Sequence, residues 1–226
     1  MTVAACILAA SADLATRLVD GTPNVRRLVD LAWAGGALPV IVLAHDPDGI
    51  IAAALAGAPV VLETPAAAGL GTAAQMARAI DLACAEVEAT QAALLWPAQM
   101  GWLDAETVTS LIETHGPDRD AVLRPAFRGV PGWPLLVPVG RLPALRTLAA
   151  TLGPEAVSEA LDAMPPSRVV ELGDPGIVLG LDTPRADLPP FEGPPEPAAD
   201  RRHEWGALVA SGPDEAPEPP TARDES

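Results

Sequence analysis

The chain has 226 residues, 49% of them hydrophobic, which is enough to bury the core of one sizeable domain with additional segments. Its formal net charge is −16 and all 14 basic side chains are arginine, so nucleic acid is not expected as a partner, because binding phosphates needs a basic face. No stretch is long and apolar enough to span a membrane, and the first residues lack the basic start of a signal peptide; we expect a cytoplasmic protein.

Apolar runs alternate with amphipathic segments in the first half of the chain. The sequence predicts strands at residues 3–10, 39–44, 59–63 and 92–96. Each is followed by a predicted helix: from Pro23 to the stop at Gly35 and Gly36, at 48–55, at 72–87, and from a cap at Asp104 to Gly116. In the first of these helices, positions with helical spacing form one apolar face: Val25, Leu28, Val29, Ala32 and Trp33.

Four successive strand–helix units predict an α/β fold with a parallel sheet between two layers of helices. Ligands of such sheets bind beyond the carboxyl ends of the strands. The loops that follow Ala10, Glu63 and Trp96 are therefore the expected location of the chemistry.

A glycine-containing motif, GLGTAA, precedes the third helix at residues 69–74. It matches the dinucleotide fingerprint G-x-G-x-x-A only weakly, because Thr64 to Ala68 separate it from the strand that should lead directly into it. A dehydrogenase is therefore disfavoured. The glycines still indicate a close approach of the backbone to something at a helix N-terminus, where a nucleotide base or ribose could bind.

The histidines and cysteines show no pattern of a catalytic or metal site. His45, His115 and His203 are far apart in sequence, and no G-x-S-x-G elbow occurs, which disfavours a hydrolase or a zinc protein. Cys6 and Cys84 lack ligand spacing, so each is expected to be a small core residue.

The C-terminal segment differs in composition from the rest. Residues 188–226 contain nine prolines, nine acidic residues and three arginines. We expect a domain at 1–188 and an acidic, proline-rich, disordered tail at 189–226. Within the tail, residues 200–210 have helical character around Trp205, and this stretch is either a remnant in a linker or a short motif that docks on a protein partner.

The order of the motifs resembles that of the MobA-like nucleotidyltransferases, which build the cytidylyl or guanylyl form of molybdenum cofactor. ILAASADLATRL at 7–18 resembles the family's loop VLAAG-x-S-x-R-M-G, and ALLWPAQMGWLDAETV at 93–108 resembles LLGDMPWVDAATV. The other matching segments are GTPNVRRLVDLAWAGG (21–36), the second and third strands (41–65), GLGTAAQMARAI (69–80), GVPGWP (129–134) and GLDTPRADL (180–188). The resemblance spans about residues 3–188 and implies a three-layer, mostly parallel, Rossmann-like sheet of the nucleotide-diphospho-sugar transferase type.

The resemblance also implies where a nucleotide would bind. The family's first loop wraps the triphosphate, and it corresponds here to Ala10, Ser11 and Arg17. Ser11 stands where the family has a glycine, and a side chain there disfavours positive φ by roughly 1 kcal/mol. The glycine-rich segment that contacts the nucleotide corresponds to a second group, namely Gly69, Gly71 and Thr72.

The positions that correspond to the family's metal ligands are altered. Gln99 stands in place of an aspartate, while Asp182 is retained and Gly180 has lost a second carboxylate. Gln99 and Asp182 are thus the weak candidates for Mg²⁺, and Asp104 is better explained as a helix cap than as a ligand. Trp133 replaces the histidine of G-H-P at the expected acceptor pocket. Core filling is the simpler expectation for the cluster formed by Trp96, Trp102 and Trp133.

Two functions follow from the resemblance and its departures. In the first, the protein is a pseudoenzyme that binds a nucleotide or a pterin-type molecule and serves as an accessory protein for molybdenum cofactor, with the tail as a tether. In the second, it is an active Mg²⁺-dependent nucleotidyltransferase that transfers a nucleotidyl group to molybdopterin or a related acceptor. The absent lysine, the altered metal aspartate and the altered loop glycine favour the first, because nucleotidyl transfer depends on positioning and on offsetting phosphate charge.

Overall fold

The computed structural model describes residues 2–193, apart from the side chain of Ala68. The predicted docking motif at 200–210, with Trp205, lies outside the described residues, as does most of the predicted tail. Among residues 2–193, no helix combines the length and the apolar content needed to cross a membrane.

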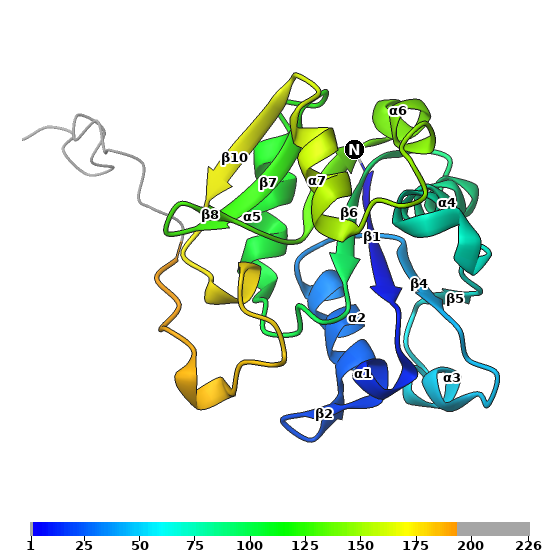
Figure 1. Cartoon of the computed structure of the whole chain (residues 1–226). Coiled ribbons are helices and arrows are strands. Elements are labelled where there is room, and N and C mark those ends of the chain that lie inside the picture. The colour runs from blue at the N-terminus through cyan, green and yellow to red at the C-terminus, as the bar shows by residue number, and fades with distance from the viewer. Residues whose placement is uncertain (1, 194–226) are drawn as a thin grey trace, which may run out of the picture. The chain divides into compact units, whose positions relative to one another are not determined.

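A mostly parallel sheet lies at the centre of the described chain (Figure 1). Its strand order is β10-β7-β9-β6-β1-β4-β5, and β8 pairs with β7. Only β9 and β8 run antiparallel to their neighbours. The bounds are β1 Thr2–Ala9, β4 Val40–Ala44, β5 Val61–Glu63, β6 Thr90–Pro97, β7 Val122–Phe127, β8 Val130–Pro131, β9 Leu135–Pro138 and β10 Ser167–Glu171. A separate two-stranded ribbon pairs β2 Leu18–Val19 with β3 Thr22–Pro23.

Helices cover both faces of the sheet. One face carries α4 Gly71–Glu86, α6 Leu142–Arg146 and α7 Pro154–Asp162, and the other carries α2 Asn24–Ala34 and α5 Ala105–His115 (Figure 1). Two short helices, α1 Ala12–Thr16 and α3 Ile50–Ala54, follow β1 and β4. The predicted three-layer, mostly parallel α/β fold is therefore confirmed.

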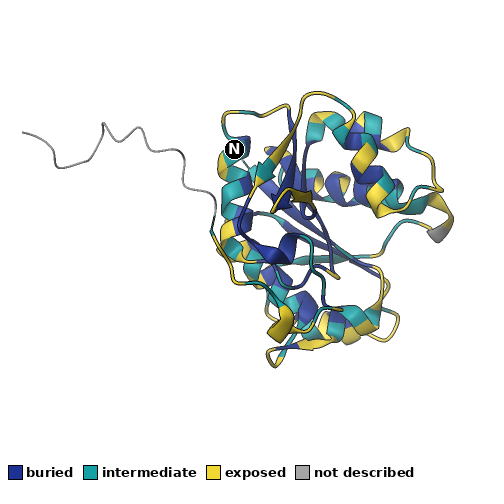
Figure 2. Ribbon diagram, turned by 60° about the vertical axis from the view of Figure 1, so that its left-hand side comes forward, coloured by how far each residue is buried: buried dark blue, intermediate teal, exposed yellow. Residues whose placement is uncertain are grey.

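The core lies between the sheet and its two helical layers (Figure 2). The central strands are buried nearly throughout, since every residue of β4 is buried. The apolar face predicted for the first helix forms that side of the core, except at Trp33, which is 40% exposed. Its Nε1 donates to the carbonyl oxygen of Pro59 at 2.8 Å, which ties the indole to the loop before β5. Cys6 is buried in the core, as expected, and Cys84 is partly buried.

The first half follows the predicted strand–helix alternation, with one shortened helix and with two additions that were not predicted, namely α1 and the β2–β3 ribbon. The helix predicted at 48–55 begins at Ile50, after Gly49 at the N-cap with a φ of +70°. The side chain of Asp46 accepts hydrogen bonds from the backbone N–H groups of Ile51 and Ala52 at 3.0 and 2.8 Å. The strands of the second half were not predicted. They add β9 between β6 and β7, antiparallel to both, and the parallel edge strand β10.

Candidate functional site

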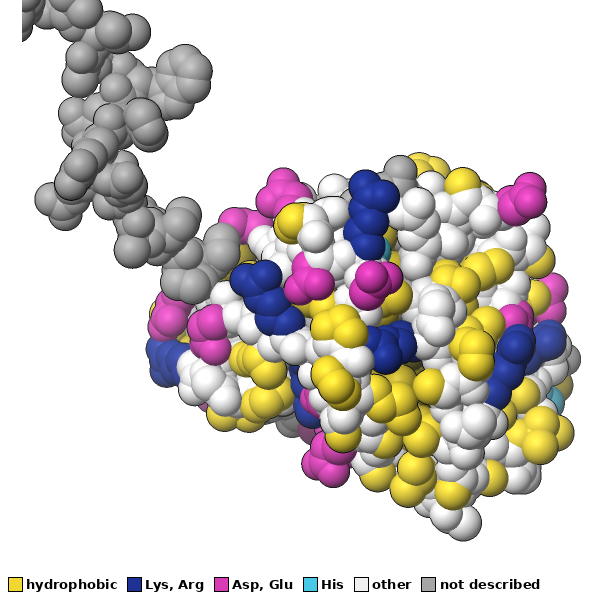
Figure 3. All heavy atoms as spheres, turned by 90° about the horizontal axis from the view of Figure 1, so that it is seen from above, with side chains coloured by type: hydrophobic (Ala, Val, Ile, Leu, Met, Phe, Trp, Pro, Cys, Tyr) yellow, Lys and Arg dark blue, Asp and Glu magenta, His cyan; other side chains and the backbone are white. Residues whose placement is uncertain are grey.

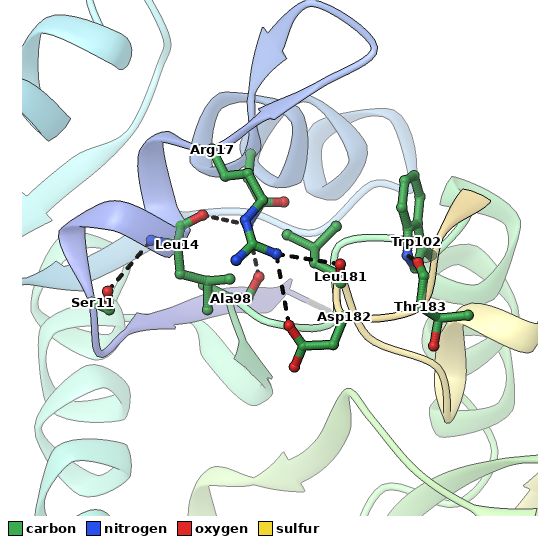
Figure 4. Close-up of polar contacts among 9 residues, drawn as sticks. Ser11, Leu14, Arg17, Ala98, Trp102, Leu181, Asp182 and Thr183 are labelled. Atoms are coloured by element: carbon green, nitrogen blue, oxygen red, sulfur yellow. Dashed lines mark hydrogen bonds and ion pairs between the residues drawn. The ribbon is translucent and has the colours of Figure 1, made fainter. Parts of the chain in front are cut away.

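The loop after β1 forms a capped helical turn at the carboxyl edge of the sheet (Figure 4). Ser11 has a φ of −137°, and its Oγ accepts a hydrogen bond from the N–H of Leu14 at 3.4 Å. A residue with this φ needs none of glycine's freedom. Serine therefore fits here without backbone strain, although the resembling family has glycine at this position. The N–H of Leu14 is bound by the side chain of Ser11 in the same loop.

Arg17 and Asp182 are far apart in the sequence, and their side chains lie next to each other at this edge (Figure 4). Nη1 of Arg17 lies 3.3 Å from the carbonyl oxygen of Leu181 and 3.7 Å from Oδ1 of Asp182. The Asp182 side chain is 99% exposed and that of Arg17 is 48% exposed. An exposed ion pair of this kind contributes less than about 1 kcal/mol, so a stronger ligand can displace either partner.

The segment around Asp182 is held against the end of β6. The carbonyl oxygen of Gln99 accepts a hydrogen bond from the N–H of Leu181 at 2.9 Å. A side chain at Gly180 would bring its Cβ within 2.9 Å of the same oxygen, so the glycine permits this approach. Arg185 adds an ion pair with Asp20 of the β2–β3 turn. The structure therefore brings the backbones of the two predicted metal-ligand positions, Gln99 and Asp182, side by side.

These two positions do not form a preformed divalent-cation site. They supply one carboxylate, which is already beside the guanidinium of Arg17, and one neutral amide. Residues 2–193 contain no group of three or more His, Cys, Asp and Glu side chains placed to hold a metal. Magnesium prefers several oxygen ligands in octahedral geometry, with charge from carboxylates or phosphates. The residues present do not fit a resident metal ion.

Asn24 connects the two loops of this edge and was not among the residues predicted for the site. Its side chain is fully buried, and Nδ2 donates to the carbonyl oxygens of Ala98, at 2.7 Å, and Leu14, at 3.3 Å. Ala98 follows β6 and Leu14 lies in α1, so one amide fixes both loops. A signal was available: Asn24 lies four residues before Leu28 and thus on the apolar face of α2, where a polar residue requires buried partners.

The predicted glycine segment lies at the start of α4. Gly71 has a φ of +76°, and a Cβ there would lie 2.1 Å from the carbonyl oxygen of Ala150. The close backbone approach that the motif predicts is therefore made by the chain itself. A Cβ at Gly69 would meet no atom within 4 Å. The loop before the helix is fixed by Gln75, whose side-chain amide bonds the N–H and the carbonyl of Ala66 at 2.7 and 2.8 Å.

Two of the three clustered tryptophans fill the core, as the simpler expectation held. Trp96 is fully buried, and Trp133 is 2% exposed. Nε1 of Trp133 donates to Oε1 of Glu155 at 2.9 Å, so the polar atom of this indole already has a partner within the protein. Trp102 is partly buried, and its Nε1 donates to the carbonyl oxygen of Thr183 at 3.0 Å, next to Asp182.

The buried carboxylate of Asp174 joins two segments near this edge of the sheet. Asp174 is 2% exposed and accepts hydrogen bonds from Thr107 Oγ1 at 2.6 Å and from the N–H groups of Asp104 and Gly176 at 2.9 and 2.7 Å. Burial raises the pKa of Asp174, and the three hydrogen bonds oppose that rise. Asp104 itself caps α5, as predicted, accepting a hydrogen bond from the N–H of Glu106 at 2.9 Å. The carboxylate therefore has a structural role in joining α5 to the segment after β10.

The sequence matches one protein family, and the fold is similar to that of several solved structures. A family model described as MobA-like NTP transferase domain matches residues 12–164. No curated protein matches the sequence. Among solved structures, the Mycobacterium tuberculosis protein Rv0371C in complex with manganese is similar with a TM-score of 0.59 at 18% identity, over 76% of this chain and 89% of that one.

Two further solved structures are similar. A nucleotidyl transferase from Methanothermobacter has a TM-score of 0.63 at 18% identity, over 80% of this chain and 92% of that one. The 2-C-methyl-D-erythritol 4-phosphate cytidylyltransferase of Thermus thermophilus has a TM-score of 0.57 at 17% identity, over 81% of this chain and 94% of that one. At these identities the likeness shows the fold, which is the one described above.

Proposed function

This chain belongs to the family of MobA-like NTP transferase domains, and we propose that it binds a nucleotide or a pterin-type molecule as an accessory protein with weak or no transferase activity. The proposed site is the carboxyl edge of the sheet, around Ala10, Ser11 and Arg17, with Gly69 and Thr72 on the neighbouring α4 side. A role connected with molybdenum cofactor is part of the proposal. So is a cytoplasmic location, with the tail and its Trp205 as the contact to a protein partner.

One observation carries the proposal: Arg17 is paired with Asp182. In this family's chemistry the arginine would meet phosphate and the aspartate would meet a metal ion, yet here each is the other's partner. Transfer of a nucleotidyl group depends on positioned cations and on offsetting phosphate charge. With no lysine in the chain and Gln99 in place of a carboxylate, the remaining cationic charge supports binding better than catalysis.

The chain's own residues would act in binding as follows. A bound phosphate would take the guanidinium of Arg17 from Asp182, since a charge-assisted bond to a dianion is stronger than this exposed pair. Asp182 and Gln99 would then face any cation that arrives with the nucleotide. That cation would be magnesium or manganese, and it would neutralise phosphate charge. Asn24 would keep the two loops in register throughout.

The test is the thermal stability of the full chain with CTP, GTP and ATP, each with and without magnesium. A ligand at 100 times its Kd adds about 2.7 kcal/mol to stability. We expect one nucleotide to stabilise the protein and Arg17→Ala to abolish the shift. Arg26→Ala is the matched control, because Arg26 forms an ion pair with Asp30 within α2.

Pyrophosphate release, followed in parallel, separates the two candidate functions. Binding without release supports the accessory role. Magnesium-dependent release that Asp182→Asn abolishes would establish the active transferase instead. No shift with any of the three nucleotides, in a protein that unfolds cooperatively, would refute a nucleotide site at this edge.

A further inference from the structure

A cavity lies at the opposite edge of the sheet, where β6 begins and β9 ends. It has a volume of about 400 Å³ and is lined by Gln91, Arg119, Asp120, Pro138, Gly140 and Arg141. Gln91 is the second residue of β6, whereas the site described above lies beyond that strand's last residue. Figure 3 views this edge of the molecule, where arginine and acidic side chains lie among uncharged surface. The cavity is thus separate from the proposed nucleotide site.

The two arginines of this cavity differ from most others in the described chain. Elsewhere in residues 2–193 arginines such as Arg78, Arg124 and Arg146 are paired with carboxylates. Within the same residues, neither Arg119 nor Arg141 has a carboxylate oxygen within salt-bridge distance. In a chain whose formal net charge is −16, two guanidinium groups that line one cavity and form no salt bridge within the described residues, although Asp120 lines the same cavity, need an explanation.

Backbone carbonyl oxygens accept hydrogen bonds from both guanidinium groups, but they use only some of the N–H donors. Nη2 of Arg141 donates to the carbonyl oxygens of Asp120 and Pro166, each at 3.3 Å, and Nε of Arg119 donates to that of Gly116 at 3.3 Å. Each guanidinium has five N–H donors. Both Nη groups of Arg119 and the Nη1 group of Arg141 therefore remain available to an occupant of the cavity.

We propose that this cavity binds a small phosphorylated molecule through Arg119 and Arg141. Planar guanidinium groups match the oxygens of a phosphate in paired hydrogen bonds, and the amide of Gln91 can supply a further donor. The carboxylate of Asp120 also lines the cavity and repels an anion, so the two guanidinium groups must outweigh this repulsion for a phosphate to bind. The volume exceeds what a free phosphate needs and lies in the range of small-ligand pockets. This inference does not depend on the proposed nucleotide site.

Isothermal titration of the full chain at constant ionic strength tests the proposal, with inorganic phosphate and ribose 5-phosphate as the two probes. We expect saturable binding that Arg119→Ala or Arg141→Ala weakens at least about tenfold, the effect of losing a hydrogen bond to a charged group. Arg168→Ala is the matched control, because Arg168 is exposed, has no salt bridge within the described residues and does not line the cavity. Tighter binding of ribose 5-phosphate would identify a phosphate ester, and equal affinity would identify the free anion, as the natural ligand class.

A second variant keeps the test sharp if Arg141→Ala unfolds the protein by freeing the carbonyls of Asp120 and Pro166. Asp120→Asn removes the opposing charge while preserving shape and backbone, so it should tighten phosphate binding. A merely structural role for the arginines predicts no such gain. The proposal is overturned if neither probe binds saturably at millimolar concentration, or if Arg168→Ala weakens binding as much as Arg119→Ala does.

Discussion

Asn24 illustrates how a single residue fixes the geometry of the proposed nucleotide site. Its amide satisfies the carbonyls of two loops, at Leu14 and at Ala98, which lie 10 and 74 residues from Asn24 in the sequence. Its Oδ1 has no hydrogen-bond partner among the described residues, and a Cβ at Gly101 would lie 2.6 Å from that oxygen. Gly101 thus leaves the room that this oxygen occupies, although the glycine supplies no donor to it.

Removal of the Asn24 side chain should destabilise the protein and loosen the site. Asn24→Ala leaves the buried carbonyl of Ala98 without its donor, which costs about 1–3 kcal/mol. Urea unfolding should show this loss, whereas Asp30→Ala, on the exposed side of the same helix, should change stability by less than about 0.5 kcal/mol. An Asn24→Ala variant as stable as the wild type would mean that water replaces the amide.

His115 makes stability depend on pH. It is fully buried at the end of α5, and neither ring nitrogen has a hydrogen-bond partner among the described residues. Burial lowers the pKa of His115, with Arg119 adding to the effect and Asp118 and Asp120 opposing it. The unfolded chain therefore binds a proton at a pH where the folded protein does not. Stability is complete above the unfolded pKa of about 6.5 and is lost as the pH falls below it.

The measurement is the midpoint of urea unfolding at pH values from 7.5 to 5.5. The wild type should lose stability over this interval, and His115→Phe should lose less, whatever its stability at pH 7.5. Parallel pH profiles for the two proteins would show that His115 does not contribute to the dependence.

The first residues of α4 and α5 anchor these two helices to other parts of the chain. Asp104 caps α5 with its own side chain, and Asp174 holds the backbone N–H of the same residue. At the start of α4, Gly71 adopts a positive φ and touches the backbone of Ala150, which joins this helix to the segment between α6 and α7. In both places an element near the proposed site is anchored to a segment distant in sequence.

Replacement of the α5 cap should weaken that helix by a predictable amount. Asp104→Ala removes the acceptor of the Glu106 N–H and should lower the free energy of unfolding by about 1 kcal/mol. Asp104→Asn keeps an acceptor at the same position and should stay within a few tenths of a kcal/mol of the wild type. Equal losses in the two variants would assign the effect to charge rather than to capping.

The two glycines of the α4 motif should respond differently to alanine. Gly71→Ala forces a Cβ against the carbonyl of Ala150 in a left-handed backbone, and we expect a loss of about 1–3 kcal/mol. In Gly69→Ala the new Cβ would meet no atom within 4 Å and the φ is ordinary, so the Tm should be unchanged or slightly higher. A neutral Gly71→Ala would show that the loop carrying Ala150 moves freely.

At the scale of the whole molecule, charge is the dominant property. A formal net charge of −16 makes the folded chain repel itself, and salt screens that repulsion over about 10 Å at 0.1 M. Thermal unfolding should therefore shift to higher temperature between about 0.01 M and 0.15 M NaCl. A fall in Tm over that interval would show that the ion pairs of the surface, such as Arg146 with Asp81, outweigh the repulsion.

The sequence by itself determined the class of fold and much of its first half, because strands and helices there differ in the period of their apolar residues. Motif order indicated the family, and Pro23 and Asp104 marked helix starts through local chemistry that needs no distant partner. The exposed position of Trp33 and the antiparallel strand β9 were not predicted from the sequence. Both depend on which segment of the chain packs against them.

Only the tertiary structure decided what the site residues do. Arg17 and Asp182 are predictable as separate candidates, but their pairing is fixed by the hydrogen bond that lays Leu181 against Gln99. The two arginines of the cavity at the opposite edge carry no local signature for the same reason, and the position of Asn24 on an apolar helix face does not reveal which carbonyls it binds. Which charges meet is settled by the sheet's strand order, a long-range property that no window of sequence contains.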